Sequence, residues 1–279
     1  MCELLGVSRA GYYRFKQGKV GEKADQKQRQ MEQVKAVFWE HKRRYGTRRI
    51  AAELQGQGQA MGRLRVRGLM QAQDLQALQP KSFVPKTTDS KHGKRSSPNL
   101  LLDEAGNRNF KVFSPNQVWV GDITYLPLTA GGFVYLATWI DSYSRKVVGW
   151  QVAPNMEESL IISALTKALE CRKPAPGLVI HSDRGGQYVS KRFRALLHQW
   201  KCKQSMSRAE DCYDNAIAES FFSRFKTELL QQGAFLELED AKTECFEFME
   251  GYYNSKRRHS AIGYKTPNQW EAIYLQNFT

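Results

Sequence analysis

The sequence predicts a mixed α/β domain with helices on the faces of its sheet, preceded by a small all-α region. Helical periodicity dominates the first 79 of the 279 residues, and a β-rich stretch begins at residue 118. The charge is also uneven, because residues 1–114 hold 23 Lys and Arg against 10 Asp and Glu, whereas residues 115–279 hold 19 against 18. We therefore expect a helical region at 1–79, a basic linker at 80–114 and an α/β domain with a C-terminal helical extension at 115–279.

The overall composition limits the classes of protein. The chain has 42 Lys and Arg, 28 Asp and Glu and a formal net charge of +14, which indicates a polyanionic partner such as nucleic acid. No run of about 18 apolar residues predicts a membrane span, and no signal-peptide pattern is present, so we expect a cytoplasmic protein without a membrane partner. The five cysteines are scattered and form no Cys-x-x-Cys pair, which argues against a disulfide framework or a structural zinc site.

The helical region begins with half of a helix-turn-helix. Ser8 follows a Gly turn and can cap a helix, but no front helix precedes it in the sequence. Apolar residues then recur at helical spacing from Met31 to Phe38, and Thr47 can cap the next helix.

A third helix is expected to bury Leu64, Leu69 and Met70. The arginines in this region are candidate DNA contacts, because an Arg-rich helix fits a major groove: Arg48, Arg49, Arg63, Arg65 and Arg67. A small helical bundle without a DNA-binding role gives the same periodicity.

The β-rich stretch predicts an antiparallel meander of strands at 118–126, 133–140 and 147–152. Asp141 is expected to cap the turn before the third strand. Alternating helices and strands follow: helices at 157–171, 190–200, from about 214 and at 239–253, and strands at 178–181 and 203–206.

Three carboxylates stand at informative positions. Asp122 interrupts an apolar strand, Asp183 follows a buried strand and precedes a Gly pair, and Glu219 lies one turn into a helix. Each alone has a structural explanation as a strand-edge, turn or helix-dipole acid. Together they supply the oxygen ligands that hard divalent cations prefer, and two such ions can hold the attacking and leaving oxygens of a phosphodiester displacement.

The motifs around these acids carry a family resemblance. The segments Trp119–Tyr125, His181–Tyr188 and Cys212–Phe222, with 35 residues between Asp183 and Glu219, resemble the DDE core of bacterial insertion-sequence transposases of the orfB type. That group belongs to the retroviral integrase superfamily. Further matches run in order along nearly the whole chain: Cys2–Tyr13, Tyr45–Ile50, Tyr253–His259 and Gly263–Pro267.

The resemblance implies an RNase H-like integrase core, with a mixed five-stranded sheet and flanking helices, and a DNA transposase activity. Asp122, Asp183 and Glu219 would hold Mg²⁺ or Mn²⁺, as two ions, to cut the transposon end and join its 3′-OH to target DNA. The helical region would bind terminal inverted repeats. The implied partners are a second copy of the chain on DNA and an upstream-frame helix-turn-helix protein joined by frameshifting, and the implied location is the nucleoid.

Other polar residues receive roles with alternatives. Lys226 either contacts the DNA end or is an ordinary exposed helix lysine, and Asn215 either orients Glu219, touches DNA or caps the helix. His181 either positions Asp183 or fills the core, and Arg257 and Arg258 are candidate DNA contacts.

One departure from the family pattern lies next to the first acid. Gly121 stands where many relatives have Thr, which is expected to alter packing. Three alternatives remain open at this point: a metal-dependent nuclease without strand transfer, a DNA-binding regulator with a vestigial site, and a product that acts only as a fusion.

Overall fold

The computed structural model describes residues 2, 4, 6–17, 19–79, 96–103, 106–107, 111–208, 215–231 and 233–277. The chain divides into two compact units, Met1–Gln79 and Pro80–Thr279. Each unit is described by itself. No helix among these residues is both long enough and apolar enough to cross a membrane.

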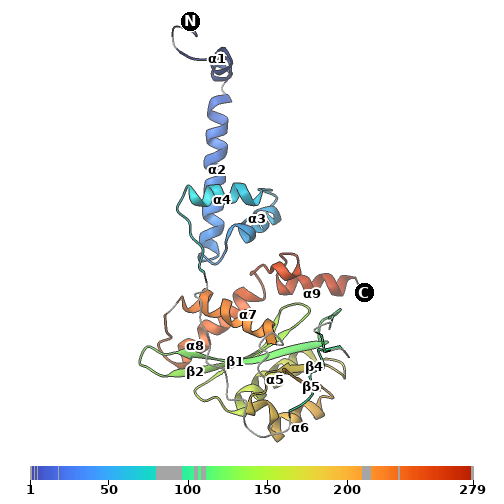
Figure 1. Cartoon of the computed structure of the whole chain (residues 1–279). Coiled ribbons are helices and arrows are strands. Elements are labelled where there is room, and N and C mark those ends of the chain that lie inside the picture. Colours follow the sequence, from blue (N-terminus) through green and yellow to red (C-terminus); the bar gives the residue numbers. More distant parts are fainter. Residues whose placement is uncertain are drawn as a thin grey trace. The chain divides into compact units, whose positions relative to one another are not determined.

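The first unit consists of helices (Figure 1): α1 Arg9–Lys16, α2 Lys19–Glu40, α3 Thr47–Gly56 and α4 Arg63–Gln71. Helices α2, α3 and α4 enclose an apolar core that includes Phe38, Leu54 and Val66. The prediction that Ser8 caps a helix is confirmed, because its Oγ accepts a hydrogen bond from the Gly11 N–H at 3.0 Å. This unit therefore has an apolar core of its own.

Two details of this unit differ from the sequence prediction. Gly46, not Thr47, is the N-cap of α3, and it makes no side-chain cap bond. Leu64, predicted to lie inside, is 80% exposed, while Val66 is fully buried. The buried residues of this helix are Val66, Leu69 and Met70, which are three and four positions apart and so share one face. Leu64 is two positions before Val66 and therefore lies on another face, toward solvent.

The second unit contains a mixed five-stranded sheet. Its strands are β1 Val118–Pro127, β2 Phe133–Asp141, β3 Val147–Ala153, β4 Val179–Ser182 and β5 Lys203–Met206. They lie in the order β3-β2-β1-β4-β5, with antiparallel β1–β2 and β2–β3 pairs and parallel β1–β4 and β4–β5 pairs. The predicted meander and five-stranded architecture are confirmed.

Helices cover both faces of this sheet (Figure 1). On one face, α5 Glu158–Arg172 and α6 Lys191–Gln199 pack on a core that contains Trp139. On the other, α7 Ala216–Phe225 and α8 Leu238–Phe246 pack on a core that contains Val120 and Leu126. Because side chains alternate along β1, residues 118, 120 and 126 face the α7 side.

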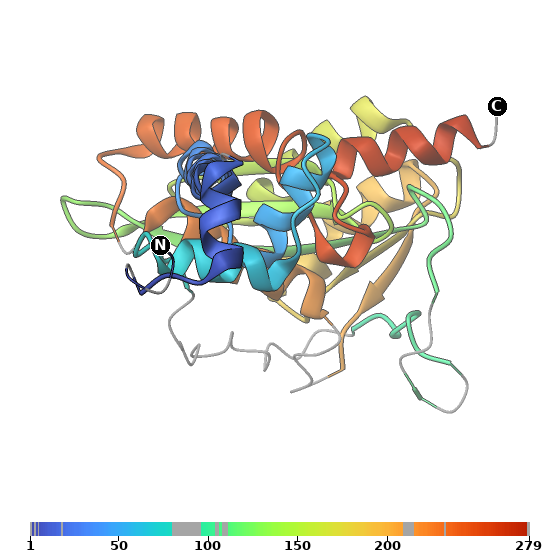
Figure 2. The ribbon, with the colours of Figure 1, turned by 90° about the horizontal axis from the view of Figure 1, so that it is seen from above.

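Short helical elements complete the second unit: η1 Gly186–Val189, η3 Lys226–Leu230, η4 Glu247–Tyr253, η5 Ser260–Ile262 and α9 Pro267–Gln276. The π-helical turns η3 and η4 continue α7 and α8, so the helix predicted at 239–253 is built from two elements. Helix α8 packs next to β3, and in Figure 2 the orange helix formed by α8 and η4 runs in nearly the same direction as the long green strands, with the red α9 near the C-terminus.

Part of the segment predicted to be a linker lies along the edge strand β5. Leu100 N–H donates to Ser205 Oγ at 2.9 Å, and Met206 N–H donates to the Pro98 carbonyl at 3.2 Å. Ser97 Oγ donates to Gln204 Oε1 at 2.8 Å. These contacts cover a sheet edge that would otherwise present unpaired backbone groups. Residues 80–95, 104–105 and 108–110 of the expected linker lie outside the described residues.

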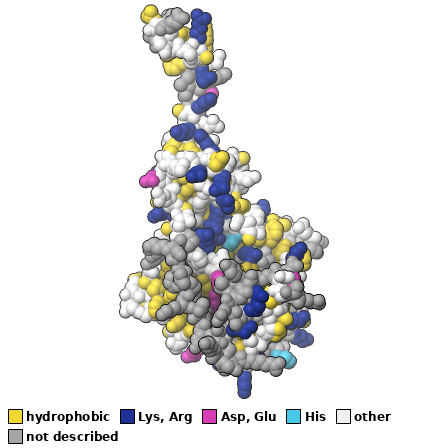
Figure 3. Space-filling view, in the orientation of Figure 1, with side chains coloured by type: hydrophobic (Ala, Val, Ile, Leu, Met, Phe, Trp, Pro, Cys, Tyr) yellow, Lys and Arg dark blue, Asp and Glu magenta, His cyan; other side chains and the backbone are white. Residues whose placement is uncertain are grey.

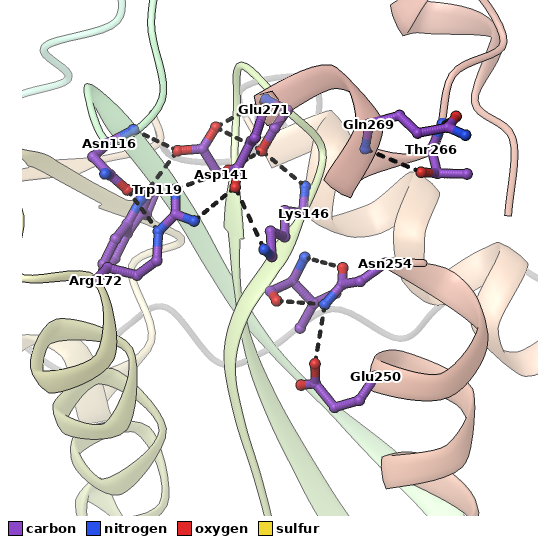
Figure 4. A network of polar contacts seen from close by, with 12 residues as sticks. Asn116, Trp119, Asp141, Lys146, Arg172, Glu250, Asn254, Thr266, Gln269 and Glu271 are labelled. Carbon is purple, nitrogen blue, oxygen red and sulfur yellow. Dashed lines mark hydrogen bonds and ion pairs between the residues drawn. The ribbon is translucent and has the colours of Figure 1, made fainter. Parts of the chain in front are cut away.

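The C-terminal helix is held to the sheet by a polar network (Figure 4). Glu271 on α9 accepts two hydrogen bonds from the Arg172 guanidinium, at 2.7 and 2.8 Å, and forms an ion pair with Lys146 at 3.4 Å. Asp141 accepts from the backbone N–H groups of Tyr143 and Ser144, which confirms that it caps the turn after β2. The network joins α5, the β2–β3 turn and α9.

Candidate active site

Asp122 on β1 and Asp183 just after β4 occupy corresponding positions on two neighbouring parallel strands. The parallel register pairs Val120 of β1 with His181 of β4, so each acid is two residues beyond the same paired position. Adjacent strands are about 4.8 Å apart. Asp122 is partly buried within β1, and by alternation it shares the α7 face with Val120. The register therefore brings two residues that are 61 positions apart to one edge of the sheet.

A tight turn holds Asp183 just after β4. Its Oδ1 accepts a hydrogen bond from the Gly185 N–H at 2.9 Å. A Cβ at position 185 would lie 3.0 Å from that oxygen and 3.1 Å from Gln187 Oε1. The glycine therefore lets the backbone approach the carboxylate closely, as the Gly pair in the sequence indicates.

Helix α7 supplies the third acid. Ala218 and Phe222 pack into the core, which fixes the helix against β1 and leaves Glu219 exposed. At the start of the helix, the Asn215 side-chain amide donates to the Gly121 carbonyl at 3.3 Å, next to Asp122. Asn215 occupies the N-cap position but makes no side-chain cap bond, so its contact is a link between α7 and β1 rather than a cap.

The electrostatics show that Asp122 is affected by both of the other acids. The pKa of Asp122 is raised from 3.8 to about 8, first because burial disfavours the charged form and next because Asp183 and Glu219 repel it. The Ile123 N–H and Lys226 act in the opposite direction. Burial also raises the pKa of Glu219 and lowers that of Lys226. The charged neighbours that affect Asp122 are therefore two carboxylates, which repel it, and one cation, Lys226.

The donor chemistry of this cluster fits a hard divalent cation, because all three side chains offer carboxylate oxygens. A cation would also relieve the repulsion that raises the pKa of Asp122. Within the described residues, however, no three His, Cys, Asp or Glu side chains are gathered closely enough to hold a metal ion as they stand. The three acids are thus coupled electrostatically but are not arranged as a closed metal cage.

His181 is fully buried beside this site. Its Nδ1 lies 2.8 Å from Ser205 Oγ and its Nε2 lies 3.2 Å from Ser207 Oγ. Both ring nitrogens are therefore engaged with residues of β5 and its end. These contacts favour the structural interpretation of His181, in which it joins β4 to β5 and so supports the turn that carries Asp183.

The arginines predicted to contact DNA fall into two groups. Four on α3 and α4 are exposed: Arg48, Arg63, Arg65 and Arg67. Arg65 also donates two hydrogen bonds to Gln30 Oε1, at 2.8 and 2.9 Å. Arg49 is partly buried over the ring of Tyr45. Figure 3 shows Lys and Arg side chains spread over the N-terminal helices with few acids among them.

The prediction for Arg257 needs correction. Its guanidinium is 2% exposed and makes a two-point ion pair with buried Glu228, at 2.6 and 2.7 Å. A side chain held in this way is not presented to DNA phosphates, and the basic run in the sequence gives no sign of these buried surroundings. Neighbouring Arg258 is partly buried and donates to the Tyr264 carbonyl at 3.1 Å.

The unusual glycine before the first acid has a packing explanation. A Cβ at Gly121 would lie 2.2 to 2.6 Å from ring atoms of Trp139 on the neighbouring strand. The register places these two residues directly opposite each other. A Thr at this position would therefore collide with the tryptophan, so the contact gives the physical reason for the expected effect on packing.

Sequence reasoning missed two features near the site. Tyr125 and Phe133 lie in the predicted strands, yet both side chains are exposed and their rings meet. Their apolar character resembles that of core strand residues, and only the position of the β1–β2 hairpin shows that they face solvent. Glu228 was also missed, because its partner Arg257 is 29 residues away.

Comparison with known proteins identifies the class of this fold and site. An integrase core domain matches residues 114–212, a second integrase core domain matches residues 200–267, and an HTH-like domain matches residues 25–83. The fold class and the class of enzyme predicted from the motifs are therefore confirmed: the protein is a DDE-type polynucleotidyl transferase with an HTH-like region.

Relatives extend this match over most of the chain. The transposase for insertion sequence element IS904 of Lactococcus lactis is 41% identical over 240 residues, 86% of this chain and 92% of that protein. The transposase InsF for insertion sequence IS3A of Escherichia coli K12 is 38% identical over 273 residues, 97% of this chain and 92% of that protein. The chain belongs to the family of bacterial insertion-sequence transposases.

A solved structure with a similar fold is the HTLV-2 integrase catalytic core domain in complex with magnesium. It is 19% identical, covers 58% of this chain and 99% of its own, and has a TM-score of 0.45.

Proposed function

We propose that this transposase binds the terminal inverted repeats of its element and uses Asp122, Asp183 and Glu219 to cut the DNA end and join it to a target. The observation that carries the proposal is the parallel register, which sets Asp122 and Asp183 two residues beyond the Val120–His181 pair. Glu219 then acts on Asp122 from the facing helix α7. Three acids from separated segments are thus directed to one edge of the sheet.

Mg²⁺ or Mn²⁺, as two ions, would be held by the three carboxylates. Such ions stabilise the attacking and leaving oxygens of a phosphodiester displacement and lower the pKa of bound water. The protein's own groups set the positions of the ligands. The Gly185 N–H fixes one oxygen of Asp183, and the Asn215–Gly121 bond fixes the start of α7 against β1.

Lys226 is proposed to contact the DNA end next to the acids. It lies in η3, directly after α7, and interacts electrostatically with Asp122. A cation at this position offsets the repulsion between the acids and a phosphate group, which would otherwise oppose DNA binding.

The helical unit is proposed to supply most of the affinity for DNA. The exposed arginines of α3 and α4 can contact phosphates or the edges of bases in a major groove. Two transposon ends must be cut and joined together, so we propose at least a dimer on DNA. We further propose that the chain also acts as a frameshift fusion with an upstream helix-turn-helix protein, and that it works at the nucleoid, where its substrate lies.

A cleavage and joining assay tests this proposal. The protein is incubated with Mg²⁺, a labelled duplex carrying the end of the element, and a plasmid target. We expect a cut strand and a labelled plasmid product, and we expect Asp183→Asn and Glu219→Gln to abolish both while leaving binding intact. Glu170→Gln, an exposed glutamate on α5, serves as the matched control.

The outcomes separate the proposal from its alternatives. Cleavage without joined plasmid would identify a nuclease that lacks strand transfer. Binding without cleavage by the native chain would favour a DNA-binding regulator or a product that acts only as a fusion, and the same assay with the fused upstream protein would distinguish these two. Full activity in Asp183→Asn would show that the triad is wrongly assigned.

A further inference from the structure

Two aromatic side chains are exposed on the β1–β2 hairpin, whose first strand also carries Asp122. Tyr125 on β1 is 42% exposed and Phe133 on β2 is 51% exposed. Their rings meet edge to face with centroids 5.1 Å apart. They lie toward the end of the β1–β2 hairpin, which projects from the rest of the sheet in both views (Figures 1 and 2). Together the two rings offer a larger exposed apolar surface than a single side chain would.

A cation lies against this pair. The Lys226 Nζ is 4.1 Å from the centroid of the Tyr125 ring, within the range of a cation–π contact. The same lysine interacts electrostatically with Asp122. Lys226 therefore connects the aromatic pair to the acid cluster, and the two features belong to one continuous part of the second unit.

The spacing between the acids and the rings matches a short length of DNA. Asp122 and Tyr125 are three residues apart on one strand, about 10 Å at about 3.3 Å per residue. Stacked nucleotides advance about 3.4 Å each along a DNA strand. Alternation turns the Tyr125 side chain to the other face of β1 from Asp122, so a DNA strand that reaches both passes around the edge of β1 that β4 leaves unpaired, beside Lys226. Measured along β1, a base on the rings would lie about three nucleotides from a phosphodiester held at the acids.

The hairpin that carries the rings is braced. Phe235 N–H donates to the Pro127 carbonyl and Thr129 N–H donates to the Phe235 carbonyl, each at 2.9 Å. Phe235 itself is 5% exposed. The loop before α8 thus adds backbone bonds to the hairpin, which keeps the rings in place without a ligand and limits the entropy lost on binding.

We propose that Tyr125 and Phe133 form a stacking site for one unpaired base at the end of the element's DNA. The proposal rests on the proposed function, because it takes the acids as the place where the DNA end is held. Aromatic rings stack on any base through its π-face, and a lysine beside them matches the phosphate of the same strand. A base removed from the duplex would free the end of the DNA to enter the acid cluster.

The proposal is tested by a double-mutant cycle in which the aromatic side chains are removed from the protein and single bases are removed from the DNA. Binding of the full chain is measured by fluorescence anisotropy, in chelator, on a labelled duplex carrying the end of the element. Three further duplexes each lack one base, at the first, second or third nucleotide from the cleavage point. We expect Tyr125→Ala combined with Phe133→Ala to weaken binding to the intact duplex by about fivefold to 150-fold.

The expected signature is coupling at one position. On the duplex that lacks the stacked base, the native chain should bind as weakly as the variant, and the variant should lose nothing further. Phe246→Ala, an exposed aromatic on α8, should bind every duplex like the native chain. Tyr125→Leu combined with Phe133→Leu keeps apolar bulk without an aromatic face, and it should reproduce the coupling seen with the alanine variant.

Equal losses on the intact duplex and on all three abasic duplexes would overturn the stacking proposal, as would native binding by the double variants. Because these measurements use binding without metal, they are independent of DNA cutting. A native chain that cuts and joins DNA but shows no coupling would leave the proposed function standing. A native chain that shows the coupling but neither cuts nor joins DNA would support the stacking site and contradict the proposed function.

Discussion

Two carboxylates in the same domain, Glu271 and Asp122, have opposite electrostatic surroundings. Glu271 lies among cations and donors, because Arg172, Lys146 and the Ser144 hydroxyl all contact it, and its pKa is lowered despite burial. Asp122 lies among other acids, and its pKa is raised to about 8. Both side chains are largely withdrawn from solvent, so the difference comes from their neighbours.

This difference in neighbouring charges distinguishes an acid that stabilises the fold from an acid that is suited to binding a cation. A carboxylate surrounded by donors stabilises the folded chain directly. A carboxylate surrounded by other carboxylates destabilises it, and such an arrangement persists where function requires it. The first, Glu271, joins α9 to the β2–β3 turn, and the second, Asp122, lies at the sheet edge where we propose DNA chemistry.

The largest expected loss of stability comes from breaking the buried ion pair between Arg257 and Glu228. Arg257→Ala would leave Glu228 buried without its two-point partner, and should lower the free energy of unfolding by about 3–5 kcal/mol. Urea denaturation measures this. Arg258→Ala removes a partly buried neighbour with a bond to a backbone carbonyl and should lose about 1 kcal/mol. Equal losses in the two variants would contradict the structural role of Arg257.

Removing the central cation of the Glu271 network should have the next largest effect. Arg172→Ala takes away two charge-assisted bonds and leaves Glu271 close to buried Asp141, so we expect a loss of about 2–4 kcal/mol in the free energy of unfolding. Adding Glu271→Gln to this variant removes one of the two acids and should restore part of the loss. If the single and double variants have the same free energy of unfolding, the loss in Arg172→Ala does not come from the unpaired charge of Glu271.

Gly121→Thr tests the packing beside the acid cluster. The added Cβ would meet the Trp139 ring, so overpacking should lower the thermal midpoint and the free energy of unfolding by roughly 1–3 kcal/mol. Combining it with Trp139→Leu makes room for the new side chain and should show a favourable coupling. If the single variant is as stable as the native chain, the tryptophan does not determine this position.

The two acids should give opposite pH dependences of stability in chelator. The folded-state pKa of Glu271 is lowered, so its contribution is present above the ordinary Glu range and is lost as pH falls below it. The folded-state pKa of Asp122 is raised from 3.8 to about 8, so stability should fall as pH rises between these values, by at most about 1.4 kcal/mol per pH unit.

Urea denaturation across a pH series checks both signs. Glu271→Gln should flatten the acid side of the profile, and Asp122→Asn should flatten the neutral side. If both variants changed the pH dependence of the free energy of unfolding in the same direction, Glu271 and Asp122 would not have opposite electrostatic surroundings.

Much of the fold and of the acid cluster follows from local sequence signals. The strands around Asp122 show β-branched and aromatic runs, and the turn at Asp141 joins two of them at short range. The acids are visible because a charge in an apolar strand is costly, and because the spacing from Asp183 to Glu219 carries a family pattern.

The features that sequence reasoning missed depend on contacts between distant residues. The Glu228–Arg257 pair joins η3 to the loop after η4, and nothing local distinguishes this arginine from an exposed one. The exposure of Tyr125 and Phe133 depends on how far the hairpin projects from the sheet. The docking of residues 96–101 on β5 depends on an edge that exists only in the folded domain.

Binding of Mg²⁺ is the most direct test of the contrast between Glu271 and the acid cluster. Isothermal titration calorimetry on the native chain should detect Mg²⁺ binding, and Asp183→Asn should weaken it strongly while leaving the free energy of unfolding in chelator unreduced. Glu271→Gln should do the opposite, lowering the free energy of unfolding and leaving Mg²⁺ binding as in the native chain. Native Mg²⁺ affinity in Asp183→Asn, or its loss in Glu271→Gln, would contradict the account.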